Sequence, residues 1–118
     1  MTLDEIAQKL SLVNRTSIGI QGREVTGGYT GDLLSCVMAG AQENSIWITI
    51  QAHPNIVAVA SLLGLSGVVV AEGIDIPQET IAKAEEHSVP LLSAQETSFT
   101  VSGRLFQMGV SGTGRTNQ

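Results

Sequence analysis

The chain has 118 residues and a mass of 12.4 kDa, enough for one compact domain with its own core and too short for two ordinary ones. Eleven acidic and six scattered basic residues give a formal net charge of -5, which argues against a nucleic acid or an anionic membrane surface as partner. One Trp, one Tyr and two Phe residues are too few for a platform on which bases could stack.

Cysteine content and the N-terminal segment predict the compartment. Cys36 is the single cysteine, so no internal disulfide can form, and the first residues are acidic where a secretory signal would be basic. We therefore expect a cytoplasmic protein. The longest apolar stretch, residues 56–71, is short and interrupted by Ser and Gly, so we expect no membrane-spanning helix.

In the first half of the chain, local patterns predict two helices and two extended pieces. The first helix begins with a capping box, in which Thr2 is the N-cap and Glu5 follows three residues later. Alternating polarity predicts the extended pieces, with a turn at Gly22 between them. In chain order, the predicted segments are a helix over 3–10, strands over 17–21 and 23–26, a glycine-rich loop over 27–32 and a helix over 33–39.

The second half of the chain alternates regularly between strands and helices. Residues 67–70 are a continuous β-branched run, which is typical of a strand buried on both faces, and Pro54 marks the first turn of a helix. Residues 93–96 form a second capping box, which we expect to open the last helix. The predicted segments are strands over 46–50, 67–70 and 89–92, and helices over 55–63, 78–87 and from the second capping box to Met108.

This order of elements predicts an α/β fold. Strands that alternate with helices pair in parallel through right-handed crossovers, so we expect a small layered domain with a mainly parallel β-sheet flanked by helices. We expect a single domain over residues 1–110, followed by a disordered tail over residues 111–118.

The helix predicted over residues 55–63 is apolar on nearly all sides. A helix that is hydrophobic all round must be buried all round, and a domain of this size covers one side with its own sheet. We therefore expect a symmetric homodimer that packs partly through this helix, with Val37 and Met38 beside it. The alternative is a helix sandwiched within the monomer.

The glycine-rich segment is one candidate ligand site. Three glycines just before a helix allow a ligand to approach the backbone closely, as in phosphate-binding loops. Asp32 would repel a phosphate at the start of that helix, so a ligand with hydroxyl or amine groups fits better. The structural alternative is a turn capped by Thr30 or Asp32.

A second candidate site lies at the carboxyl ends of the predicted parallel strands, where open sheets of this kind collect ligands. Polar side chains and glycines stand at these ends, and the alternative is that they are caps and turns. The candidate ligand-binding residues of both sites are Thr26, Gly27, Gly28, Tyr29, Thr30, Asp32, His53, Asn55, Glu72, Gly73 and Ser93.

The sequence gives no positive sign of an enzyme. His53, His87 and the lone Cys36 do not stand at a metal-binding spacing. Cys36 has apolar neighbours, and no pair of carboxylates has a spacing that would place both in one cleft. We therefore expect no catalytic residues, no metal and no cofactor.

Two runs of sequence resemble a known family. They are residues 25–35 (Val-Thr-Gly-Gly-Tyr-Thr-Gly-Asp-Leu-Leu-Ser) and residues 46–60 (Ile-Trp-Ile-Thr-Ile-Gln-Ala-His-Pro-Asn-Ile-Val-Ala-Val-Ala), and the similarity continues through residues 81–92 and 103–106. On these runs the chain resembles a stand-alone DRTGG-domain protein. That family is related to the N-terminal domain of HPr kinase/phosphorylase, and similar domains lie inside some phosphate acetyltransferases and between the CBS domains of some regulated pyrophosphatases.

The resemblance implies an α/β domain that dimerises and has a regulatory or scaffolding part. It does not imply a kinase, because the related domain precedes the one that carries the P-loop. We therefore expect a non-enzymatic regulatory or interaction module, dimeric, that docks on a partner enzyme or senses a small molecule. The alternative is a protein that binds an adenine-nucleotide-like small molecule at the carboxyl ends of the parallel strands.

Overall fold

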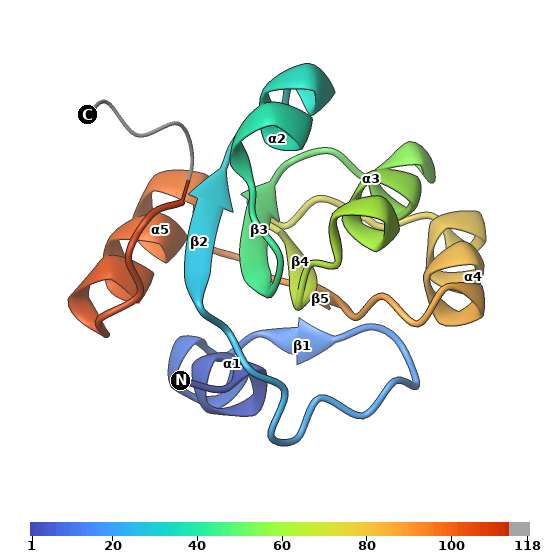
Figure 1. The fold of residues 1–118 in the computed structure, drawn as a ribbon. Helices are drawn as coiled ribbons and strands as arrows, with labels where there is room; N and C mark the ends of the chain where they lie inside the picture. Colours follow the sequence, from blue (N-terminus) through green and yellow to red (C-terminus); the bar gives the residue numbers. More distant parts are fainter. Residues whose placement is uncertain (114–118) are drawn as a thin grey trace.

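The computed structural model describes residues 1–113, and residues 114–118 lie outside the described part. One five-stranded sheet has helices on both faces, so the domain is a three-layer α/β/α sandwich (Figure 1). Its elements are α1 (Leu3–Leu10), β1 (Val13–Asn14), β2 (Gly27–Thr30), α2 (Leu34–Gly40), β3 (Ser45–Thr49), α3 (Asn55–Leu63), β4 (Gly67–Val70), α4 (Gln78–Glu86), β5 (Leu91–Ser93) and α5 (Ser98–Gln107).

The sheet has the strand order β1-β5-β4-β3-β2. Strands β2 to β5 run parallel, and β1 is antiparallel to β5. Helices α1 and α5 cover one face, and α2, α3 and α4 cover the other (Figure 1). The predicted α/β fold with a mainly parallel sheet flanked by helices is therefore confirmed.

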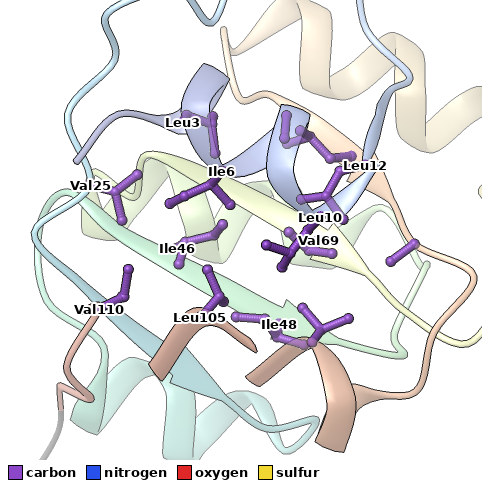
Figure 2. Close-up of a cluster of buried hydrophobic side chains, with 14 of the residues drawn as sticks. Leu3, Ile6, Leu10, Leu12, Val25, Ile46, Ile48, Val69, Leu105 and Val110 are labelled. Atoms are coloured by element: carbon purple, nitrogen blue, oxygen red, sulfur yellow. The ribbon is translucent and has the colours of Figure 1, made fainter. Parts of the chain in front are cut away.

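Both faces of the sheet are apolar, because the strands are buried on two sides. On the α1/α5 face, Leu3 and Ile6 of α1 point at Ile46 and Val69 of the sheet (Figure 2). On the other face, the side chain of Trp47 is completely buried, and its Nε1 donates a hydrogen bond of 2.8 Å to the carbonyl of Gly31. Two separate cores thus hold the sheet between its helix layers.

The predicted strand over residues 17–21 is wrong, and this segment is a loop. Side-chain hydrogen bonds of Asn14 compete with strand pairing: its Oδ1 accepts from the backbone N–H of Thr16 at 3.0 Å, and its Nδ2 donates to the carbonyl of Ile18 at 2.8 Å. The N–H of Ser17 donates to Glu85 of α4 at 2.7 Å. These contacts hold the loop against the α4 side, and only the short β1 joins the sheet here.

The predicted loop over residues 27–32 contains a strand, β2, which pairs with β3. Its glycines permit the close approach of the C-terminal segment on the outer side. The N–H of Gly28 donates to the carbonyl of Ser111 at 2.9 Å, and the N–H of Thr113 donates to the carbonyl of Gly28 at 2.8 Å. A Cβ atom at Gly27 would overlap the side chain of Thr113. Residues 111–113 of the expected tail are therefore paired with the sheet edge.

Of the two predicted capping boxes, the first is confirmed and the second is wrong. The N–H of Thr2 donates to Oε1 of Glu5 at 2.9 Å, at the start of α1. Ser93 instead belongs to β5, where it lies opposite Val70, so its backbone is held extended. Helix α5 begins at Ser98, with the N-cap Thr97 accepting a hydrogen bond from the N–H of Thr100.

The apolar helix α3 is covered mainly within the monomer. Its residues Ile56, Val57, Val59 and Ala60 are buried between the sheet and its neighbours α2 and α4, whereas Leu62 is 72% exposed. Val37, which was expected at a dimer interface, is completely buried as well. Its proposed place in an interface is therefore wrong, although Met38 is exposed. The dimer itself stays a prediction.

Within residues 1–113, every helix is too short or too polar to cross a lipid bilayer.

Candidate functional site

The carboxylate of Asp32 has a structural role at the end of β2. Its Oδ1 accepts hydrogen bonds of 2.8 Å from the hydroxyl of Thr49 and from the N–H of Ile50. The side-chain amide of Gln51 donates to the backbone carbonyl of Asp32 at 3.1 Å. Asp32 thus ties the loop after β2 to the end of β3 and does not cap α2, whose N-cap is Leu33.

His53 and Asn55 lie at the start of α3. The imidazole Nδ1 of His53 accepts a hydrogen bond of 3.1 Å from the N–H of Asn55. This bond satisfies one of the N–H groups that a helix leaves free in its first turn. His53 therefore works as a cap, and its ring is exposed.

The remaining rim candidates, Glu72, Gly73 and Ser93, lie where β4 and β5 end, close to the start of α5. Glu72 and Gly73 both have positive φ angles, of 66° each. Oε2 of Glu72 accepts a hydrogen bond of 3.2 Å from the N–H of Ser98, the first residue of α5. The N–H of Gly73 donates to the carbonyl of Ala94 at 2.9 Å, just beyond Ser93. Glu72 thus caps α5, and Gly73 joins the turn after β4 to the residue that follows β5.

The candidates of the glycine-rich segment point in different directions, because successive side chains of a strand alternate between faces. Tyr29 faces α2, where its ring packs so closely on Gly40 that a Cβ atom there would lie 2.7 Å from the ring. Thr26 lies at the other end of β2, and its hydroxyl donates to the carbonyl of Glu43 at 3.3 Å. Gly28 and Thr30 face α5.

The structure thus divides the eleven candidates among several places, and it brings two of them to a cavity. This cavity, which we call the α5 groove, has a volume of about 370 Å³ and lies between the edge strand β2, helix α5 and residues 110–112. The described residues that line it are Gly28, Thr30, Ile48, Phe99, Ser102, Gly103, Leu105, Phe106, Val110, Ser111 and Gly112.

The α5 groove is almost entirely apolar. Of its few polar side chains, Thr30 and Ser102 have their hydroxyl oxygens 2.7 Å apart and share a hydrogen bond. None of the described lining residues is ionisable. Phosphate or carboxylate groups would find no positive charge among these residues, so the groove suits an uncharged apolar surface.

The outer wall of the groove consists of two aromatic rings on either side of a notch. Phe99 is 88% exposed and Phe106 is 73% exposed. They lie four residues before and three residues after Gly103, and therefore on one face of α5. A Cβ atom added at Gly103 would meet no described atom within 4 Å. The opposite face of α5 buries Val101 and Leu105 in the core.

A second cavity, of about 360 Å³, lies between α1 and α5 and contains Lys9 and Arg104. Arg104 is already engaged there: Nη1 donates to Oε1 of Glu96 at 3.0 Å, and Nη2 donates to the backbone carbonyl of Lys9 at 2.9 Å. Arg104 thus joins the two helices through both of its Nη atoms.

The carboxyl groups with shifted pKa values lie away from both the rim and the groove. A hydrogen bond from the backbone N–H of Thr2 lowers the pKa of Glu5. A hydrogen bond with the side chain of Thr2, and a second from the N–H of Gly22, lower the pKa of Asp4. These shifts belong to the N-terminal cap of α1. No cluster of His, Cys, Asp and Glu that could hold a metal ion occurs among residues 1–113.

Comparisons with known proteins agree with this picture of a small α/β domain. The model of the DRTGG domain family matches residues 3–108. No curated protein was found to be similar to the chain. The fold is similar to a crystal structure of the CBS and DRTGG domains from the regulatory region of a Clostridium perfringens pyrophosphatase, complexed with the activator diadenosine tetraphosphate.

That similarity has a TM-score of 0.66 with 19% sequence identity, and it covers 93% of this chain and 47% of the other. The chain therefore spans about half the length of the pyrophosphatase regulatory region, and what the two share at this identity is the fold. Because the family model covers nearly the whole chain, the protein belongs to the DRTGG-domain family.

Proposed function

We propose that this protein is a non-enzymatic regulatory module that docks on another protein through the outer face of α5. The observation that carries this proposal is the pair of exposed rings, Phe99 and Phe106, at the wall of an apolar groove. Exposed apolar surface of this kind marks interaction sites, and aromatic residues are common among the anchors of protein interfaces. The regulatory character of the pyrophosphatase region with the same fold is consistent with this role.

Burial of the two rings alone would supply only part of the binding free energy that a specific complex needs. Burial of an exposed Phe side chain contributes about 1.5–3 kcal/mol, so both rings together contribute about 3–6 kcal/mol. A dissociation constant of about 1 μM needs about 8 kcal/mol after the entropic cost of association. The other walls of the α5 groove must therefore also be covered by the partner, which places the centre of the interface at the groove.

The side chains at the rim support the non-enzymatic part of the proposal. A general acid or base must be free to face a substrate proton. Asp32, His53 and Glu72 instead accept hydrogen bonds from backbone N–H groups of their own fold. A turnover assay with phosphoryl donors should therefore give the same rate with the protein as in a blank without it.

Replacement of Phe106 by Glu in the native host tests the docking face. A strain in which the gene is deleted provides the phenotype for comparison. Leu62→Glu is the matched control, because Leu62 is exposed to the same extent, 72% against 73%, but lies on α3 at the other face of the sheet. At equal protein abundance, Phe106→Glu should reproduce the deletion phenotype and Leu62→Glu should not. The reverse result would contradict docking through α5.

A second candidate function is the binding of an adenine nucleotide at the carboxyl ends of the strands, by residues such as His53, Asn55 and Ser93. It is favoured by one observation, the diadenosine tetraphosphate in the pyrophosphatase structure. Against it, the rim candidates include the carboxylates of Asp32 and Glu72 and no lysine or arginine. A polyphosphate would therefore meet negative charge there.

Thermal unfolding with adenosine, AMP and diadenosine tetraphosphate separates the two functions. A ligand at 100 times its dissociation constant stabilises a protein by about 2.7 kcal/mol, which is readily measured. We expect no shift with any of the three. A shift that His53→Ala removes would instead establish the nucleotide site at the rim.

A further inference from the structure

The α5 groove reaches down to the hydrophobic core. Of the residues that line it, Ile48, Leu105 and Val110 are almost completely buried and belong to the core of the α1/α5 face (Figure 2). The two rings at its outer wall, Phe99 and Phe106, are largely exposed. A protein surface laid across the rings covers them but leaves the space above this floor unfilled, and unfilled apolar space lacks packing contacts. A small molecule inside the groove would make those contacts.

Two glycines keep the groove open, and the backbone does not require either of them. Neither Gly28 nor Gly103 has a positive φ angle. A Cβ atom at Gly103 would meet no described atom within 4 Å, and one at Gly28 would lie 3.5 Å from Cγ1 of Val110, an ordinary contact distance. Glycine makes a helix or a strand less stable than alanine does. Folding alone therefore does not account for glycine at these positions, whereas an open groove does.

The hydroxyl groups of Thr30 and Ser102 give the groove a polar point. Their oxygens lie 2.7 Å apart, so one hydroxyl donates its hydrogen to the other. Two hydroxyl groups carry two hydrogens, and only one of these is used in the bond between them. The second hydrogen and the remaining lone pairs can therefore bond one hydroxyl or carbonyl group of a ligand.

We propose that the α5 groove binds a small, uncharged and largely apolar molecule with one hydroxyl or carbonyl group, which hydrogen-bonds to Thr30 and Ser102. The volume of about 370 Å³ equals that of about 12 water molecules at about 30 Å³ each, so the ligand has about a dozen non-hydrogen atoms. No described lining residue is ionisable, so a charged ligand would lose its hydration without gaining a partner charge.

This site is distinct from both functions considered above. Its ligand differs from a nucleotide in carrying no phosphate, and none of His53, Asn55 and Ser93 lines the groove. The site also does not require that α5 docks on another protein. If both hold, the ligand lies against walls that the docked partner covers, so the binding of one changes the affinity for the other by the same factor in both directions.

An NMR titration of isotope-labelled protein with 2-naphthol tests the site. This probe is uncharged at neutral pH, largely apolar and similar in size to the expected ligand, and it has one hydroxyl group. The amide signals of Gly28, Gly103 and Gly112 should shift and saturate, with a dissociation constant below about 1 mM, whereas that of Gly73 at the rim should not. 2-Naphthoate, which carries a carboxylate instead, should bind at least about 10 times more weakly. No saturable shift at these three glycines, or equal binding of 2-naphthoate, would overturn the site.

A pair of matched variants locates the ligand in the groove. Gly103→Leu places an apolar side chain among the lining residues, and Gly19→Leu is the control in the loop between β1 and β2, where a Cβ atom also meets no described atom within 4 Å. Gly103→Leu should weaken the binding of 2-naphthol at least about 10-fold, and Gly19→Leu should leave it unchanged. Circular dichroism verifies that both remain folded. Equal affinities of the two variants would overturn the location.

Removal of both hydroxyl groups tests the polar point. The double variant Thr30→Val and Ser102→Ala keeps the groove apolar and should weaken the binding of 2-naphthol about 5-fold, the loss typical of one hydrogen bond. Ser102→Ala alone should have a smaller effect, because the hydroxyl of Thr30 can still bond the ligand. An unchanged affinity of the double variant would contradict the bond to this pair.

These results can be told apart from the test of the proposed function. If 2-naphthol does not bind but Phe106→Glu reproduces the deletion phenotype in the host, docking through α5 holds and the ligand site fails. If 2-naphthol binds in the groove but Phe106→Glu has no phenotype, the ligand site holds and the proposed docking function fails.

Discussion

The carboxylate of Asp32 accepts a hydrogen bond of 2.8 Å from the buried hydroxyl of Thr49, and so joins the end of the edge strand β2 to the end of β3. This link matters because β2 has two glycines among its four residues, and glycine favours extended structure poorly. The strand that carries Gly28 and Thr30 to the α5 groove is therefore held by contacts at its ends.

Replacement of Asp32 by Ala should lower the free energy of unfolding by about 1–3 kcal/mol, since the hydroxyl of Thr49 and the N–H of Ile50 lose their acceptor. Urea denaturation followed by the fluorescence of the buried Trp47 measures the change. Asp75→Ala, in the exposed loop before α4, should change the free energy by less than about 0.5 kcal/mol. Equal effects of the two variants on the free energy of unfolding would contradict the structural role of Asp32.

The cap of α1 makes stability depend on pH. Because the N–H of Thr2 lowers the pKa of Glu5 below its ordinary value of 4.5, the contribution of Glu5 is present above that value. It is lost as the pH falls through the lowered pKa. Glu5→Gln should therefore be less stable than the wild type at about pH 7, and the difference should shrink below about pH 4. Thermal unfolding over this range measures it, and a constant difference would contradict the cap.

Arg104 should stabilise the fold through two hydrogen bonds, one to Glu96 and one to the carbonyl of Lys9. Arg104→Ala should lower the free energy of unfolding by about 1–2 kcal/mol, since the ion pair is about half-exposed and contributes little of its own. Arg104→Lys should recover less than half, because an ammonium group cannot make the forked contact. Salt should weaken only the contribution of the ion pair with Glu96, and urea denaturation at low and high salt measures this change.

Gly103→Ala should increase the stability of the protein. Since a Cβ atom at Gly103 meets open space, alanine should stabilise α5 in the monomer by about 0.5–1 kcal/mol through its higher helix propensity. Urea denaturation measures the change, and a loss of stability would contradict the open space found at Gly103.

The second half of the fold was predictable because each segment there has its own pattern of apolar residues and its own Gly or Pro residues at the ends. The bounds of α3 and β4 agree with the prediction, and Gly64 ends α3 with a φ angle of 67°. The first half depends on contacts that are distant in sequence. The edge strand β2 reads locally as a glycine-rich turn, and it becomes a strand because β3 pairs with one side and residues 111–113 with the other.

The site was less predictable for the same reason. Gly28 and Thr30 were among the candidates, but the groove they line needs α5, whose start was placed too early by the polar run at residues 93–96. Phe99 and Phe106 were missed, because a sequence does not show which side of an amphipathic helix its neighbours leave open. Their positions on both sides of a glycine, at helical spacing, were the available signal.

The pairing of residues 111–113 along β2 also determines where the chain leaves the domain. Thr113, whose N–H donates to the carbonyl of Gly28, lies next to Gly112, which lines the α5 groove. A purification tag or a fusion partner attached after this point would start beside the mouth of the groove and crowd it. The amino end is therefore the better point of attachment for any reporter used on this protein.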